Sequence, residues 1–117
     1  MHTWSDTLPI YRQLADRLAA QLLDGEPPEG EAMPSVRALA SRYLINPLTV
    51  SRALQSLVDE GLVESRRGLG MYVQAGARQR LRRSERERFL QEEWPRLAAR
   101  LKRLGITPND LDWEATE

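Results

Sequence analysis

The sequence contains no cysteine, one histidine and no long apolar run. Without cysteine the chain has neither a disulfide framework nor a thiolate metal site, and we expect no bound metal. No apolar run approaches the roughly 20 residues that a transmembrane helix needs, and no signal-peptide pattern opens the chain. These absences predict a cytoplasmic protein that does not enter a membrane.

Groups that perform catalysis are also scarce. The histidine, His2, lies next to the N-terminus, and the carboxylates Glu26, Glu29 and Glu31 lie in a loop rich in proline and glycine with no base nearby. The glycines of Gly68–Gly70 do not sit between a strand and a helix, as a nucleotide-binding loop requires. We therefore expect no enzyme and no cofactor.

The formal net charge of the 117 residues is zero, but the charges are unevenly distributed. Residues 1–76 carry seven arginines against nine acidic residues, and residues 77–103 carry ten basic residues against four acidic ones. Residues 104–117 carry four acidic residues and no basic one. The distribution of charge therefore says more about possible partners than the total does.

The segment 46–61 has the features of a recognition helix. Asn46 is a candidate N-cap, Pro47 suits the first helical position, and Gly61 is a residue on which helices often end. Helical spacing places four apolar residues on one face, namely Val50, Leu54, Leu57 and Val58. The other face and its flanks carry Leu48, Thr49, Ser51, Arg52, Gln55 and Ser56. A cation, an amide and short hydroxyls are the groups that read base edges in a DNA major groove.

The residues that follow predict a two-stranded hairpin. Leu62–Ser65 and Met71–Gln74 are β-prone, and the connection between them contains Arg66, Arg67 and Gly68. The arginines supply positive charge, and the glycine lets the backbone approach a phosphate closely. A helix followed by a basic hairpin is half of a winged helix-turn-helix. We expect a residue or two near Ala32–Met33 to pair with this hairpin.

Two amphipathic helices are predicted before the recognition helix. The first begins at Pro9 after a loose arm, and its inner face carries Ile10, Leu14, Leu18 and Leu22. The second has Ser35 as its cap, and its inner face carries Val36, Leu39, Ala40 and Tyr43. Arg37 lies on the outer side of its first turn, where it either contacts a DNA phosphate or is solvated. Leu44–Ile45 form the turn into the recognition helix.

Residues 8–73 resemble the N-terminal DNA-binding domain of the GntR family of bacterial transcriptional regulators. The resemblance rests on PIYRQLA, Gly25, MPSVRALA, TVSRAL, DEGLVE and RRGLGMYV, which occur in the family's order and spacing. The short remainder and its LKRLGIT motif resemble the YtrA-type subfamily, whose members are dimeric repressors with a short helical dimerisation region. The resemblance implies DNA contacts by Arg37, Thr49, Arg67 and Gly68.

Three positions depart from the pattern of the family. Its members commonly have arginine at the position of Pro47, arginine or a polar residue at that of Ser51, and a basic or polar wing residue at that of Leu69. Arg52 lies one step along the same helix, and we expect it to take over part of the contact.

The C-terminal third is predicted to be helical. Ser84 and Glu87 form a possible capping box, so that a helix begins there or earlier, and Gly105 ends it. Pro95 predicts a kink or a break. An apolar stripe runs along this helix, formed by Leu90, Trp94, Leu97, Leu101 and Leu104. The stripe either meets a second copy, which we favour, or folds back on its own winged domain.

We therefore predict a mainly α fold with a small β-hairpin. Residues 1–76 form a winged helix-turn-helix domain and residues 77–117 a helical dimerisation region. The predicted function is that of a dimeric repressor bound to an inverted-repeat operator in double-stranded DNA. The alternatives are a winged-helix protein-interaction module and the N-terminal part of a larger regulator. The predicted DNA contacts are Arg37, Leu48, Thr49, Ser51, Arg52, Arg66, Arg67 and Gly68, and the five stripe residues are the predicted dimer contacts.

Overall fold

The computed structural model describes residues 3–115 and divides the chain into two compact units, which meet between Arg82 and Arg83. The predicted fold class is confirmed: helices dominate, and one antiparallel hairpin accompanies them. His2 and the last two residues of the predicted dimerisation region lie outside the described residues. Within residues 3–115, no helix combines the length and the apolar character that crossing a membrane needs.

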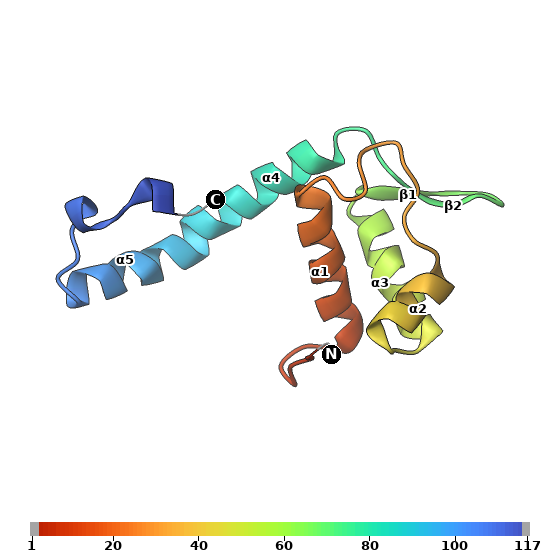
Figure 1. Cartoon of the computed structure of the whole chain (residues 1–117), viewed down its shortest axis with the longest axis horizontal. Helices are drawn as coiled ribbons and strands as arrows, with labels where there is room; N and C mark the ends of the chain where they lie inside the picture. Colours follow the sequence, from red (N-terminus) through yellow and green to blue (C-terminus); the bar gives the residue numbers. More distant parts are fainter. Residues whose placement is uncertain (1–2, 116–117) are drawn as a thin grey trace. The chain divides into compact units, whose positions relative to one another are not determined.

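The first unit contains three helices, a hairpin and the beginning of a fourth helix (Figure 1). Its elements are α1 (Ile10–Leu23), α2 (Val36–Tyr43), α3 (Pro47–Asp59), β1 (Val63–Arg66), β2 (Gly70–Val73) and the start of α4 (Ala77–Arg88). Helices α1 and α2 both pack against α3, and the hairpin follows α3 directly. This arrangement is a winged helix-turn-helix.

The predicted helix caps are present. The Ser35 hydroxyl accepts a hydrogen bond from the backbone N–H of Ala38, and the Asn46 side chain accepts one from Leu48, at 2.7 Å. These bonds satisfy N–H groups that a helix leaves unpaired in its first turn. At the end of α3, Gly61 adopts a positive φ of 75°, which permits the N–H of Leu62 to bond the carbonyl of Leu57.

The core of the first unit is built from the apolar faces that helical spacing predicts, except that Ile10, at the first position of α1, is 41% exposed. The fully buried residues include Leu14, Leu18 and Leu22 of α1, Leu39 of α2, and Val50, Leu54 and Leu57 of α3. The inner strand positions Val63 and Val73 close this core from the wing side. Ala77 and Leu81 of α4 are buried in the same cluster.

The wing strands differ by one residue from the predicted ones. Their register pairs Val63 with Val73 and Arg66 with Gly70. Leu62 is not part of β1, because its N–H donates to the carbonyl of Leu57 at the end of α3. The predicted pairing near Ala32–Met33 is confirmed: Ala32 bridges to Tyr72, and the N–H of Met33 donates to the carbonyl of Met71 at 2.8 Å.

The segment before α1 is held in place, so the expectation of a loose arm is wrong for residues 3–8. The Gln13 amide donates to the carbonyl oxygens of Ser5 and Leu8 and accepts from the N–H of Ser5. The Trp4 ring lies 6.1 Å from the Tyr43 ring, and the guanidinium of Arg17 lies 4.4 Å from the Trp4 ring centre. Contacts between side chains this far apart in sequence leave no periodic signal.

Helix α4 begins at Ala77, before the Ser84 position of the possible capping box. Its start is capped from a distant loop, because the Glu29 carboxylate accepts hydrogen bonds from the N–H groups of Gly76 at 2.8 Å and Arg78 at 3.3 Å. Ser84 is therefore inside a helix, and the cap is a residue that local sequence cannot identify.

The second unit contains the rest of α4, a π-helical turn (Phe89–Glu93), α5 (Trp94–Arg103) and two short 3₁₀ turns, Pro108–Asp110 and Trp113–Ala115. The interruption predicted from Pro95 takes the form of this π-helical turn, in which the N–H of Trp94 bonds the carbonyl of Phe89. Proline has no N–H and its ring crowds the carbonyl four residues before it, so a wider turn relieves the conflict. Gly105, with a φ of 71°, ends α5 as predicted.

Candidate nucleic-acid interface

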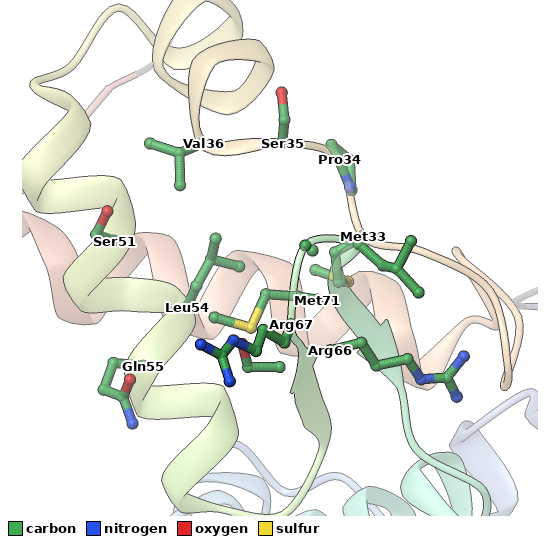
Figure 2. Close-up of a pocket in the computed structure, with 14 residues that line it drawn as sticks. Met33, Pro34, Ser35, Val36, Ser51, Leu54, Gln55, Arg66, Arg67 and Met71 are labelled. Atoms are coloured by element: carbon green, nitrogen blue, oxygen red, sulfur yellow. The ribbon is translucent and has the colours of Figure 1, made fainter.

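A groove of about 500 Å³ lies between α3 and the wing (Figure 2). Ser51 and Gln55 line it from α3, Ser35 lines it from the start of α2, and Arg67 and Gly68 line it from the wing. Apolar side chains of Met33, Leu54 and Met71 complete its lining. The groove therefore presents hydroxyl, amide and guanidinium groups around an apolar base, which is a chemistry suited to DNA base edges and phosphates.

The two arginines of the wing differ in direction. Figure 2 shows the Arg67 side chain extending toward α3 and the Arg66 side chain extending the opposite way. Arg66 forms an ion pair with Glu64 at 3.0 Å, and its guanidinium lies 4.1 Å from the Tyr72 ring centre. Both arginines line the groove, but the Arg66 guanidinium braces the hairpin through Glu64 and Tyr72, and Arg67 directs its positive charge toward α3.

Arg52 lies on the α1 side of the recognition helix and does not line the groove. Its guanidinium carbon is 4.2 Å from the centre of the Tyr11 ring. A cation over an aromatic face is attracted by the electron-rich ring while its in-plane N–H groups stay available. Tyr11 thereby restricts the direction of Arg52 without using all of its donors.

The remaining predicted DNA contacts lie at the starts of α2 and α3. Leu48 is 78% exposed in the first turn of α3, and Thr49 beside it is half-buried. Arg37 is exposed in the first turn of α2, next to Ser35 and Val36, which line the groove. The structure thus brings Ser51, Arg66, Arg67 and Gly68 together at the groove and distributes the other predicted residues around it.

Two residues at this surface, Gln55 and Tyr11, are not among the predicted DNA contacts. Gln55 lies on the predicted outward face of α3, and its spacing of four residues from Ser51 indicates that both face the same side. Its amide also donates to Asp59 at 3.1 Å. Tyr11, in the first turn of α1, is not among the predicted contacts, and no local pattern connects it with Arg52.

The five predicted dimerisation residues leave much apolar surface uncovered in the second unit. Leu90 is 47% exposed, Trp94 and Leu97 are each 43% exposed, and Leu104 is 61% exposed. Leu101 is half-buried. A continuous apolar stripe of this kind marks an interaction surface more often than a solvated one. Among residues 3–115, no group of three histidine or acidic side chains is placed to hold a metal ion.

Residues 10–73 match the family model described as bacterial regulatory proteins, gntR family. The transcriptional repressor YtrA of Bacillus subtilis is 40% identical over 70 residues, which cover 60% of this chain and 54% of YtrA. The regulator YhcF of Bacillus subtilis is 31% identical over 109 residues, which cover 88% of this chain and 84% of YhcF. The chain spans only 27% of the repressor MngR of Escherichia coli, with 42% identity over 65 residues that make up 56% of this chain.

Solved structures show the same architecture. A GntR family transcriptional regulator from Listeria monocytogenes superposes with a TM-score of 0.71 at 25% identity, covering 91% of each chain. The DNA-binding domain of AraR, solved in complex with its operator ORE1, superposes with a TM-score of 0.56 at 25% identity, covering 62% of this chain and 89% of that one.

Proposed function

Because this chain belongs to the gntR family of bacterial regulatory proteins, we propose that it is a dimeric transcriptional repressor that binds an inverted-repeat operator. Its class is that of DNA-binding transcriptional regulators, since its relatives and its fold are those of such regulators and not of enzymes. Dimerisation, repression and the two-fold operator are the proposed part. Bacterial operators lie in the cytoplasm, where we expect the protein to act.

The groove between α3 and the wing is the observation that carries the proposal. Ser51 and Gln55 are held by one helix and Arg67 by the hairpin, so three kinds of hydrogen-bonding group converge on one concave surface. We propose that α3 enters the major groove with Ser51 and Gln55 toward base edges, and that Arg67 and Gly68 follow the adjacent backbone. AraR, whose DNA-binding domain shares this fold, binds an operator.

The other predicted contacts receive separate roles. Arg37, exposed at the start of α2, contacts a phosphate, and Leu48 and Thr49 lie where the first turn of α3 meets the bases. Arg52, held by Tyr11, contacts the DNA at the α1 side of the helix. Arg66 keeps the hairpin in shape through Glu64 and Tyr72.

The proposed dimer uses the exposed stripe of the second unit. A single recognition helix reads only a few base pairs, and two-fold pairing of subunits doubles the sequence that is read. Burying a fully exposed leucine or tryptophan side chain contributes roughly 1.5–3 kcal/mol. The stripe residues are about half exposed, so each contributes part of this, and ten of them in a dimer together oppose the entropic cost of association. The similarity to YhcF covers 88% of this chain and therefore extends into the second unit, so a related regulator has a counterpart of this region.

We also propose that the DNA-binding unit extends to Arg82 and the dimerisation region begins at Arg83. The burial of Ala77 and Leu81 in the core of the first unit supports this boundary, since a domain ending at residue 76 would lack both.

Binding-site selection from random DNA tests the proposal. We expect the selected sequences to contain an inverted repeat with half-site centres about 10 bp apart, bound by two chains. Footprinting and mass measurement of the complex check the repeat and the stoichiometry. A single unrepeated half-site bound at full affinity by one chain contradicts the dimeric model.

A further inference from the structure

Trp113 is an exceptionally exposed apolar residue. Within its own unit the side chain is 91% exposed, at the start of the last 3₁₀ turn. Large aromatic side chains are seldom left in water, and an exposed one marks a contact surface. The residues on either side, Asp112 and Glu114, are acidic, and so is Asp110 in the preceding 3₁₀ turn.

A pocket of about 280 Å³ lies where the π-helical turn meets α5. Phe89 and Leu97 supply its apolar surface, and Arg96 and Arg100 supply positive charge, while Glu93 is the one acidic side chain at its edge. Phe89 is 38% exposed. Because Leu97 also belongs to the apolar stripe, the pocket is continuous with the proposed dimer surface.

We propose that Trp113 of one chain docks in this pocket of a second copy of the chain. The inference rests on the proposed dimer. The indole ring would contact Phe89 and Leu97, and the acidic residues beside it would face Arg96 and Arg100. An arginine against the indole face adds a cation–π attraction.

The occupant is a second copy because the two features are complementary and belong to one chain. Trp113 and the pocket lie in the same unit, and the exposure of Trp113 shows that it does not fill its own pocket. In a two-fold dimer the contact forms twice, since each chain offers one tryptophan and one pocket. Tryptophan is one of the residue types whose removal from the buried centre of an interface weakens binding most.

A charge exchange tests the contact. One variant carries Arg96→Glu and Arg100→Glu, and the other carries Asp112→Arg and Glu114→Arg. In either homodimer both contacts place like charges together, whereas in a mixed dimer both contacts pair opposite charges. Sedimentation of each full-length variant is expected to show weakened dimers, and an equimolar mixture is expected to recover the dimer.

Substitution of the tryptophan is the second arm. Trp113→Ala is expected to raise the dimer dissociation constant by about thirtyfold or more, as loss of an interface tryptophan typically does. Trp113→Phe keeps an aromatic ring and is expected to have a smaller effect. Leu69→Ala, which removes an exposed apolar side chain from the wing, is the control and is expected to leave dimerisation unchanged.

The outcomes distinguish failure of the proposed Trp113 contact from failure of the proposed dimer. If wild-type chain dimerises and every variant dimerises equally well, the Trp113 contact is wrong and the dimer stands. A third variant carries all four charge changes in one chain. If this variant dimerises but the equimolar mixture of the two double variants does not, Trp113 docks within its own chain and the proposal is overturned. If the wild-type chain is a monomer at high concentration, both the contact and the proposed dimer are wrong.

Discussion

The guanidinium carbon of Arg52 lies 4.2 Å from the centre of the Tyr11 ring, so α1 determines where an exposed arginine of the recognition helix points. A cation–π contact does not use the guanidinium N–H groups as hydrogen-bond donors, so they remain able to bond to DNA. This contact links the first helix of the fold to the proposed operator-binding surface.

Removing the aromatic ring at Tyr11 should weaken operator binding. Tyr11→Leu loses a cation–π attraction of roughly 0.5–1 kcal/mol at an exposed site, so we expect a two- to fivefold rise in the dissociation constant. Tyr11→Phe keeps the ring face and should bind like the wild type. Fluorescence anisotropy on the selected operator measures both. Equal affinity of the leucine variant would show that Arg52 does not depend on Tyr11.

The wing arginines provide a matched pair, since they are adjacent and carry the same charge. Arg67→Ala should weaken binding to all DNA sequences and lower the slope of log affinity against log salt by about 0.9, as loss of one phosphate contact does. Arg66→Ala should leave that slope nearly unchanged, because its guanidinium is engaged by Glu64 and Tyr72 on the other side of the hairpin. Titrations at several salt concentrations distinguish the two. A larger effect at Arg66 would reverse the assignment.

The position of the domain boundary is testable by truncation. A chain ending at Arg82 should fold as a monomer, because it keeps the whole core of the first unit. A chain ending at Gln74 loses the buried Leu81 and the Glu29 cap of α4, and should be less stable by at least about 2 kcal/mol. Urea unfolding of both chains measures the difference.

Two point substitutions serve as controls for that experiment. In the full-length chain, Leu81→Ala should destabilise the first unit, whereas Leu104→Ala, in the exposed stripe, should not. Equal stability of the two truncated chains would place the boundary before Ala77.

Leu44 offers a way to stabilise the fold. Its φ of 57° lies in the left-handed region, which costs a non-glycine residue roughly 1–2 kcal/mol, and its side chain is 81% exposed. Asparagine tolerates this conformation, so Leu44→Asn should raise the free energy of unfolding by about 0.5–1 kcal/mol. Leu48→Asn makes the same chemical change at a similarly exposed helical position and should not stabilise. Thermal and urea unfolding test the pair, and equal effects would exclude relief of backbone strain.

The elements that the sequence determined by itself are those specified within a few residues. Ser35 and Asn46 cap helices by bonding N–H groups two or three positions ahead, and Gly61 and Gly105 end helices through their own backbone conformation. Helical spacing likewise places Leu54 and its neighbours in the core. These patterns are local in origin, which is why the limits of the first three helices and the presence of the wing could be predicted from the chain alone.

Tertiary structure alone decided the contacts between residues far apart in the chain. Arg52 of α3 contacts Tyr11 of α1, and Glu29 caps a helix that begins at Ala77. Arg66 and Arg67 are adjacent in sequence, yet one braces the hairpin and the other enters the groove. No local pattern encodes these partners, because which polar groups meet depends on how the helices and the hairpin pack around the shared core.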